Sequence, residues 1–367
     1  MFDVSLENSF NFLSDEYRTL FESSRATAFQ HPLWLDGLYR RLVPRSNAEP
    51  LIIAVRSSEN GRLAMILPLT RRRYGVVKVV EFADLRVSDY AAPVCDEATF
   101  ALVLRDKTAC ERIRTALDPC DFLRIQKLRD DTLPLDRLLG SVPRSLMATS
   151  AHSVPLYGPF QQWRADNLDR SFRKNLDMRA RRLSRRGSPQ FAISSDAESI
   201  TATFHHMRDY HLPRFQDAYR KERDALQKPL YFDFYLDLAI AGAAAGLCRT
   251  YTLWLDGRPI AGLWGLSERG RFMTILQGFD SAEYKNCSLG SLMFEALARD
   301  CIERGETVLD FTIGDEPYKQ SFGAKPTAMW TISGPRSSLG ALVGLVTEQM
   351  PWTMRLAKRI ASRKAFA

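Results

Sequence analysis

CRTYTLWLDGRPIAGLWGLSERGRFMTILQGF, residues 248–279, carries the clearest secondary-structure pattern in the chain. Two apolar runs flank Asp256-Gly257-Arg258, and β-branched and aromatic residues on both sides of an Asp-Gly turn are typical of an antiparallel hairpin. A third run, RFMTILQGF, follows a Glu-Arg-Gly turn. The stretch therefore predicts a meander of three antiparallel strands.

A loop of small residues after the meander opens a predicted helix. The loop is NCSLGS, residues 286–291, and the helix LMFEALARDCIERG carries apolar residues at roughly helical spacing before Gly305 ends it. Such a loop leaves backbone N–H groups unpaired at the positive end of the helix dipole, so it favours a bound pyrophosphate. The alternative is an ordinary helix start with Ser288 as the N-cap.

The sequence TVLDFTI, residues 307–313, predicts one more strand, and the polar turn GDEPYKQSFG follows it. If this strand parts from its neighbour beside the loop, its edge groups can bind an extended pantetheine arm. Tyr318 in the turn is a candidate acid, because a phenol beside the sulfur can protonate the thiolate that leaves a thioester. The alternative is a structural tyrosine that packs with Phe322.

The other charged residues near this turn have two interpretations each. Asp315 and Glu316 are candidate bases for an amine or hydroxyl nucleophile, or they are solvated surface residues. Asp310 lies within an apolar strand, so we expect it to be buried, paired and holding the turn in place. Lys319 either neutralises an acidic substrate or a cofactor phosphate, or it forms an ion pair with Glu316.

This order of elements resembles the acyl-CoA N-acyltransferase (GNAT) fold, and more narrowly the acetyltransferase domain of the bacterial cellulose-biosynthesis CelD/BcsL group. The resemblance covers less than half of the chain, from about Leu168. The matching residues are Gly278, Tyr284, Ser288-Leu289-Gly290, Gly305, Leu309-Asp310-Phe311, Gly314, Tyr318-Lys319 and Phe322. Leu289 stands where that family has proline.

The resemblance implies an α/β (α+β) fold and an acyltransferase that uses acetyl-CoA or another acyl-CoA without a metal. It implies an amine or hydroxyl acceptor, on a sugar or polysaccharide precursor, and a link to exopolysaccharide biosynthesis. The residues assigned to the donor are Gln277, Gly278, Phe279, Asn286, Cys287, Ser288, Leu289, Gly290, Ser291 and Leu292. Those assigned to the substrate are Tyr284, Arg173 and Lys319.

Length and composition indicate a globular protein with more than one domain. The chain has 367 residues, of which 45% are hydrophobic, enough for two ordinary cores. Its most apolar run, LAIAGAAAGLC, is too short for a membrane span, and the N-terminus lacks a signal-peptide pattern. We therefore expect a cytoplasmic location. The six cysteines lack metal-finger spacing and are expected to be reduced thiols.

An earlier part of the chain repeats the pattern of the meander. Residues 61–82 span nearly the same length as residues 257–279, with a turn glycine, three predicted strands and a terminal Phe in both. This repetition predicts two tandem copies of one fold. The first copy has SDYAAP after its last run, and Pro93 cannot donate a backbone N–H. Only the second copy is therefore expected to bind the cofactor.

Domain boundaries follow from this repeat. Residues 1–150 form a degenerate GNAT-like domain that begins with a segment of helical pattern, and residues 151–335 form the acetyltransferase domain. Residues 336–367 form a basic, amphipathic helical tail that can contact a membrane surface.

Positive charge is concentrated in one predicted helix. Residues 164–186 contain nine Lys or Arg against three Asp, a net charge of +6 out of +8 for the chain. The helix is a solvated face over a leucine stripe, a partner for CoA phosphates or an acidic acyl carrier protein, or a nucleic-acid surface. A single aromatic residue, Phe172, and no reading element disfavour specific nucleic-acid recognition.

Two other functions stay open. The tandem layout resembles the Fem family of aminoacyl-tRNA-dependent peptidyl transferases, which implies tRNA as a partner. A non-catalytic scaffold in envelope or exopolysaccharide assembly, docked through its basic tail, is the alternative from another class. His205, His206 and His211 miss the spacing of a helical metal pair, so no metal site is expected.

Overall fold

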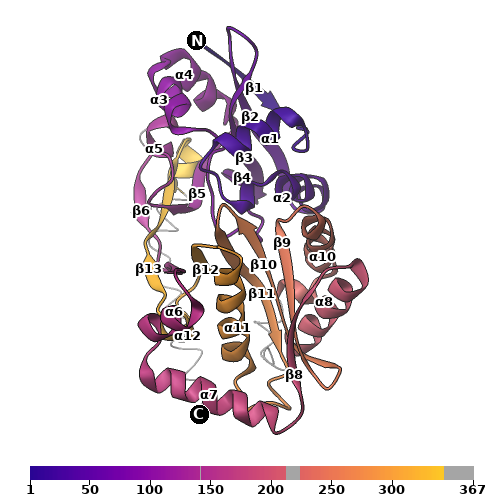
Figure 1. Cartoon of the computed structure of the whole chain (residues 1–367). Coiled ribbons are helices and arrows are strands. Elements are labelled where there is room, and N and C mark those ends of the chain that lie inside the picture. Colours follow the sequence, from indigo (N-terminus) through magenta and orange to yellow (C-terminus); the bar gives the residue numbers. More distant parts are fainter. Residues whose placement is uncertain (141, 212–223, 343–367) are drawn as a thin grey trace, which may run out of the picture. The chain divides into compact units, whose positions relative to one another are not determined.

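Two seven-stranded sheets organise the chain in the computed structural model, which describes residues 1–140, 142–211 and 224–342 (Figure 1). They belong to two compact units that exchange segments. The first unit contains residues 1–26, 43–147 and the chain from residue 330, and the second contains residues 27–42 and 148–329. The predicted tail lies mostly outside the described residues.

The first unit has the strand order β1-β2-β3-β4-β5-β14-β6, with β4 and β5 parallel. Its helices include α3 and α4, which cover a core that contains Phe100 and Ile113. Its strands are β1 (Phe2–Glu7), β2 (Ala48–Ser57), β3 (Leu63–Tyr74), β4 (Val77–Phe82), β5 (Phe122–Arg129), β6 (Arg144–Leu146) and β14 (Met329–Pro335). Its helices are α1 (Asp15–Ser23), η3 (Val43–Arg45), α3 (Glu97–Arg105), α4 (Lys107–Ala116) and α5 (Leu135–Leu138).

The second unit has the order β13-β7-β12-β11-β10-β9-β8, with β11 and β12 parallel. Its strands are β7 (Ala151–Pro155), β8 (Pro189–Ser194), β9 (Cys248–Leu255), β10 (Arg258–Glu268), β11 (Arg271–Phe279), β12 (Val308–Ile313) and β13 (Lys325–Thr327). Its helices are η1 (Ala28–Gln30), α2 (Pro32–Gly37), η2 (Leu38–Leu42), α6 (Phe160–Asn167), α7 (Arg170–Ser184), α8 (Ala197–His211), η5 (Ala225–Gln227), α10 (Pro229–Ala244), α11 (Leu289–Glu303) and α12 (Pro317–Ser321).

The internal repeat is confirmed by the two sheets. In each unit three antiparallel pairings, β1 to β4 or β8 to β11, precede one parallel pairing. The predicted meander is β9-β10-β11, and Gly257 turns its first hairpin with a φ of 79°. An Asp-Gly turn tolerates this left-handed geometry because glycine has no Cβ.

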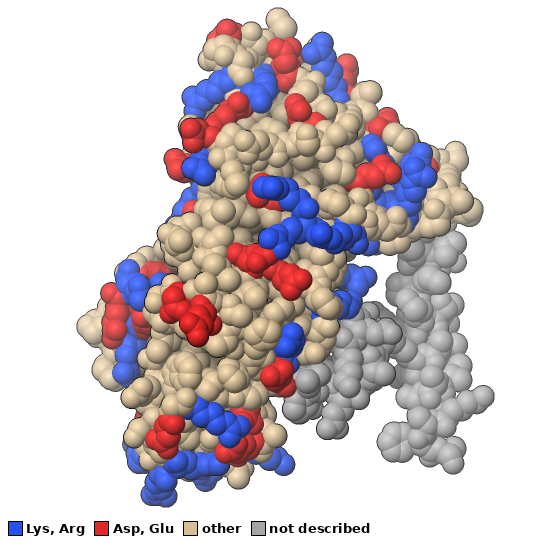
Figure 2. Space-filling model, turned by 90° about the vertical axis from the view of Figure 1, so that its right-hand side faces the viewer, with Lys and Arg blue, Asp and Glu red and all other residues tan. Residues whose placement is uncertain are grey.

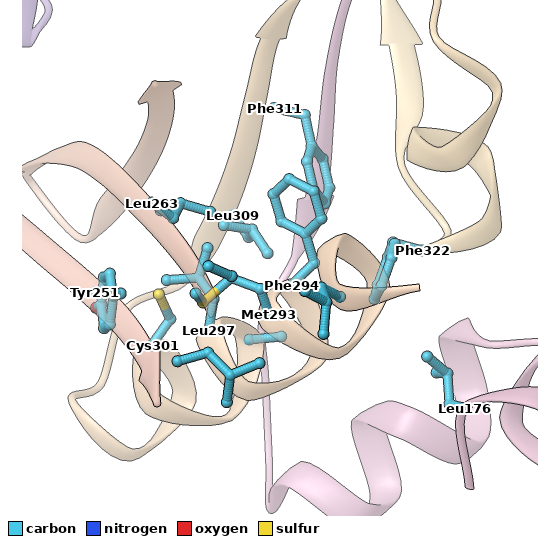
Figure 3. Close-up of a cluster of buried hydrophobic side chains, with 14 of the residues drawn as sticks. Leu176, Tyr251, Leu263, Met293, Phe294, Leu297, Cys301, Leu309, Phe311 and Phe322 are labelled. Carbon is cyan, nitrogen blue, oxygen red and sulfur yellow. The ribbon is translucent and has the colours of Figure 1, made fainter. Parts of the chain in front are cut away.

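The two faces of the second sheet carry different helices. One face packs on α11 over a core to which Met293, Leu297, Leu263 and Leu309 belong (Figure 3). The other face receives α8, and Gly278 makes the close approach possible, because a Cβ there would lie 2.6 Å from the backbone of Met207. The site described below lies on the α11 face.

The two units differ from the predicted domains, residues 1–150 and 151–335, because each unit includes a segment from outside its predicted range. Trp34 of α2 packs edge-on against Phe234 of α10, with ring centroids 5.5 Å apart, which ties residues 27–42 to the second unit. The return of β14 to the first sheet moves the end of the second unit to residue 329. The helical interpretation of the N-terminus is wrong for Phe2–Glu7, which form an edge strand beside β2.

None of the helices in the described residues combines the length and apolar character that crossing a membrane requires. All six cysteines are buried and none is disulfide-bonded, as expected.

Candidate acyl-donor site

The helix α11 begins without a side-chain cap. Ser288 is its N-cap residue, but its backbone is left-handed, with φ 48° and ψ 57°, and its hydroxyl accepts no cap hydrogen bond. The first amides of an α-helix have no intrahelical partner, so a cap that is not made leaves them for a ligand. Ser288 is thus the N-cap residue by position, but the alternative of an ordinary cap is wrong because its side chain makes no cap hydrogen bond.

A pocket of about 280 Å³ opens at this helix start. The loop before α11, its first turn, the end of β11 and α12 all contribute to its wall. The lining residues are Gln277, Phe279, Ser281, Tyr284, Lys285, Ser288, Leu289, Gly290, Ser291, Phe294 and Tyr318. The donor residues predicted in the first turn thus lie together with the predicted acid, Tyr318.

Two features of the pocket wall fit an extended ligand. Gln277 carries a side-chain oxygen that is buried without a hydrogen-bond partner, and an unpaired buried oxygen is costly unless a ligand donates to it. Gly290 lies so near Phe279 that an added Cβ would be 3.0 Å from the ring. The residues present therefore fit a donor that places anionic groups at the helix start and an amide-bearing arm along β11.

The strands β11 and β12 part beside the pocket, which meets the condition for binding an extended arm at the strand edge. Their parallel pairing covers only Arg271–Met273 and Val308–Asp310. Asp310 is 1% exposed, accepts from the amide of Thr312 at 2.8 Å and pairs with Arg271 at 2.8 Å, so the expectation of a buried, paired carboxylate is confirmed. This pairing holds the end of β12 in place as the strands diverge.

Tyr318 is half-buried at the start of α12 and lines the pocket. Its ring stacks on Phe294 of α11, with centroids 5.1 Å apart and an angle of 14°, and meets Phe311 edge-on at 6.0 Å. Rigid packing fixes the direction of the phenol, which general acid catalysis requires. This packing is also what the structural alternative predicts, because Tyr318 packs against the core cluster that contains both Phe294 and Phe322.

Asp315 is exposed but held by two donors. His152 of β7 contributes its Nε2 at 3.0 Å and the amide of Ser150 lies 3.3 Å away. The hydrogen bond from His152 lowers the pKa of Asp315, with the Ser150 amide and the Lys319 charge acting in the same direction. Asp315 is therefore an ionised carboxylate at the end of β12, suited to hold a cationic or proton-donating acceptor.

Lys319 has all three donors engaged by the end of β12 and the turn that follows it. Its Nζ is 2.9 Å from the carboxylate of Glu316, 2.9 Å from the carbonyl oxygen of Gly314 and 3.3 Å from that of Thr312. Lys319 is 2% exposed. The structure thus supports the ion-pair alternative, and the assignment of Lys319 to substrate binding is corrected because no proton of the ammonium is left to donate.

Eight residues assigned from the sequence do not line this pocket. Asp315, Glu316 and Lys319 belong to the turn and short helix after β12, outside its wall. Gly278 faces α8, Cys287 is buried in the core, and Leu292 packs against that core. Asn286 accepts from Arg182 through its backbone oxygen, and Arg173 accepts from Arg164 in the same way. Their spacing along the chain placed them near the loop, whereas the direction of each side chain is set by packing.

Several site residues were not assigned from the sequence. His152 lies in a short strand with no motif around it, and it reaches Asp315 only because β7 and β12 are neighbours. His211 contacts the backbone oxygen of Gln277 and lies 3.2 Å from Asp224, an arrangement that the residue spacing does not reveal. Lys285, by contrast, directly precedes the predicted loop in the sequence, and this position could have identified it as a pocket residue.

The first unit has a different helix start at the corresponding place. The carboxylate of Asp96 caps α3 by accepting from the amide of Thr99 at 2.8 Å. Burial raises the pKa of Asp96, but the hydrogen bonds from Thr99 prevail and lower it. An ionised cap occupies the amides and repels an anion. This difference supports the expectation that the second copy alone holds the donor.

No group of three His, Cys, Asp or Glu side chains in residues 1–140, 142–211 and 224–342 is placed to bind a metal ion.

Residues 170–320 match the protein-family model described as the acetyltransferase (GNAT) domain. A comparison with curated protein sequences found no match. The matched range contains α7, the meander, α11 and α12, and so includes the whole pocket. The narrower likeness to the CelD/BcsL group stays a prediction.

Solved structures share the fold over nearly the whole chain. FemX is similar with a TM-score of 0.59 and 11% identity, over 89% of this chain and 96% of that chain. L-PGS from Bacillus licheniformis is similar with a TM-score of 0.54 and 13% identity, over 91% and 95%. The C-terminal domain of a putative lysylphosphatidylglycerol synthetase from Agrobacterium fabrum has a TM-score of 0.54 and 13% identity, over 90% and 93%. The predicted α+β fold of two tandem GNAT-like units is confirmed.

Proposed function

We propose that the protein is an acyltransferase that takes an acyl group from acyl-CoA, most simply acetyl-CoA, and passes it to an amine or hydroxyl acceptor. The observation that carries the proposal is the pocket in which the uncapped first turn of α11 and the phenol of Tyr318 form one wall. The match of residues 170–320 to the acetyltransferase (GNAT) family supports the same reaction class.

Each part of the pocket has a task in this reaction. The amides of Leu289 and Gly290, at the positive end of α11, receive the diphosphate of the donor. The pantetheine arm runs along the open edge of β11, where Gln277 offers an acceptor oxygen. The acceptor attacks the thioester carbonyl carbon, the C–S bond breaks, and Tyr318 protonates the departing thiolate.

Asp315 supplies a negative charge at the end of β12, in the turn that leads to Tyr318. Its carboxylate stays ionised at neutral pH because His152 and the Ser150 amide lower its pKa. It can therefore hold the acceptor by charge and hydrogen bonding, whereas its lowered pKa makes it a weak base, so that the proton of the acceptor passes on to water. Glu316 is less suited to that task, because its carboxylate pairs with Lys319.

Calorimetric titration with acetyl-CoA and a thiol-release assay with amine and hydroxyl acceptors test the proposal together. Binding, and thiol release that depends on an acceptor, are expected. Absence of binding to any CoA ester would contradict the proposal. Binding of a lipid surface or a protein partner in that case would favour the scaffold instead, and release of amino acid from aminoacyl-tRNA would favour a Fem-like transferase.

A further inference from the structure

A stripe of four cations runs along the solvent side of α7. Arg170, Lys174, Arg181 and Arg185 fall within roughly 60° of one another at 100° per residue, and the stripe is about 22 Å long at 1.5 Å per residue. All four side chains are exposed, and they form no ion pair with any described residue. In Figure 2, Lys and Arg gather at the lower edge of the view, at the height of α7 in Figure 1. We call these four residues the cationic stripe.

The stripe points away from the protein rather than into the pocket. The opposite side of α7 carries Leu176 and Leu183, which are buried in the core of the second unit. Between these two sides, Arg182 donates to the backbone oxygen of Asn286 at 2.9 Å, and Arg186 donates to that of Glu283 at 2.8 Å. The flank of α7 therefore fixes the loop at the pocket rim, and the cationic stripe lies beside the mouth.

We propose that the cationic stripe docks the acidic helix of an acyl carrier protein, which delivers its acyl thioester into the pocket on a phosphopantetheine arm. This inference rests on the proposed acyl-transfer function and names the macromolecular form of the donor. A carrier protein and CoA present the same arm to the pocket, so the chemistry at Tyr318 is unchanged.

Free CoA does not account for the stripe. Phosphates bound at the start of α11 lie inside the rim, whereas the stripe covers about four turns of a helix on its outward side. Lys285 is the cation in the pocket wall itself and suffices to meet one phosphate. Cations that face solvent over this length need a partner with an anionic surface of similar extent.

The centre of α7 favours a protein over a nucleic acid. Met178 lies between the two pairs of cations and is 42% exposed, which gives an apolar contact for a helix of a partner protein. The neighbouring Asp177 is paired with Arg164 at 2.6 Å, so it does not neutralise the cations of the stripe. A protein helix with both acidic and apolar side chains fits this mixture, because protein interfaces join an apolar centre to a charged rim.

The transfer step is balanced in this form. The acceptor nitrogen or oxygen forms a bond to the acyl carbon, the C–S bond to the carrier's pantetheine breaks, and the sulfur takes the proton of the Tyr318 hydroxyl. The acceptor loses its own proton to water, directly or by way of Asp315. A proton from solvent then restores the hydroxyl of Tyr318. The products are acylated acceptor and carrier with a free thiol.

A charge-reversal variant tests the inference. Arg170, Lys174, Arg181 and Arg185 are each changed to Glu, and kcat/KM is measured with an acetyl-loaded type II acyl carrier protein and with acetyl-CoA. We expect the value for the loaded carrier to fall at least about tenfold, since opposite charge steers association. The value for acetyl-CoA should change less than about twofold, since exposed, distant charges contribute little. Binding of fluorescently labelled carrier is measured in the same preparations without turnover.

The matched control places the same charge change elsewhere. Arg62, Arg105, Lys107 and Arg137 are exposed cations of the first unit, and changing all four to Glu keeps the net charge equal to that of the test variant. This control should keep its rate with the loaded carrier. Equal losses in both variants, equal losses with both donors, or no carrier binding by the natural chain would overturn the docking inference. Turnover of acetyl-CoA in the last case would leave the proposed function standing, and binding of tRNA in place of carrier would assign the stripe to nucleic acid.

Discussion

The ring of Tyr318 lies stacked on that of Phe294, with centroids 5.1 Å apart and planes inclined by 14°. One ring comes from the short helix after β12 and the other from the second turn of α11, so the stack joins the predicted acid to the predicted donor loop. Both residues line the pocket. Because the two rings are stacked, the hydroxyl of Tyr318 is held in a constant position relative to the start of α11.

Tyr318→Phe should lower kcat by about a hundredfold, in the lower part of the range for lost acid catalysis, with little change in KM. Phenylalanine keeps the stack on Phe294, so thermal unfolding should stay the same. The loss should shrink with a thioester whose thiol is more acidic, because such a leaving group needs no proton. Tyr157→Phe is the control, since Tyr157 is 43% exposed and outside the pocket. Full turnover of Tyr318→Phe would end the acid assignment.

Gly290→Leu should weaken acetyl-CoA binding by at least about tenfold, or 1.4 kcal/mol. An added Cβ already meets Phe279 at 3.0 Å, and the longer side chain fills the space at the helix start. Calorimetry measures the affinity. Gly37→Leu is matched, because a Cβ at Gly37 meets the ring of Phe234 at 3.3 Å in the same unit but outside the pocket. Unchanged affinity in folded Gly290→Leu would remove the donor site from this helix.

Gly278→Ala should act on stability rather than on the donor. The new Cβ would lie 2.6 Å from the backbone of Met207, and overpacking of this kind costs about 1–3 kcal/mol. Urea unfolding should show the loss, while the folded fraction binds acetyl-CoA as before. A selective loss of affinity at unchanged stability would return Gly278 to the donor site and contradict the packing described here.

His152→Leu should raise the pKa of Asp315 toward its ordinary value of 3.8, and His152→Gln should restore part of the shift by donating from its amide. A carboxylate whose folded pKa is lowered stabilises the fold above its unfolded pKa, and the contribution is lost as pH falls through the folded pKa. The natural chain should therefore lose this contribution in acid, and His152→Leu should lack it at neutral pH.

Carbon-13 NMR titration of the carboxyl carbon of Asp315 measures that shift. Asp121 serves as the internal reference, because a hydrogen bond from Ser337 and the amide of Lys78 lower its pKa in the first unit. Its titration should be the same in all three proteins. An Asp315 titration that does not respond to His152→Leu would show that the His152 contact does not set its charge.

Local sequence patterns predicted the elements around the site, because turns, helix starts and buried strands are determined by residues close together in the sequence. The Asp-Gly turn at Gly257 gives the hairpin, small residues before Leu292 give the start of α11, and an Asp within an apolar strand requires a partner, which is Arg271. The left-handed backbone of Ser288 was not predicted, since serine is normally an ordinary N-cap.

Long-range packing decided what the sequence left open. Trp34 joins the second unit because its partner, Phe234, lies 200 residues further along the chain. His152 contacts Asp315 because β7, which lies near the start of the second unit in the sequence, pairs with β12. Gly278 matched a family pattern, yet its direction toward α8 follows from the alternation of side chains along β11, with Gln277 facing the pocket.

Amide hydrogen exchange with and without acetyl-CoA shows whether the start of α11 holds the donor. We expect slower exchange at Leu289 and Gly290 when acetyl-CoA is bound, and no change at Glu97 and Ala98, where Asp96 caps the corresponding helix of the first unit. Binding of acetyl-CoA that leaves the amides of Leu289 and Gly290 unprotected would contradict the claim that the start of α11 holds the donor.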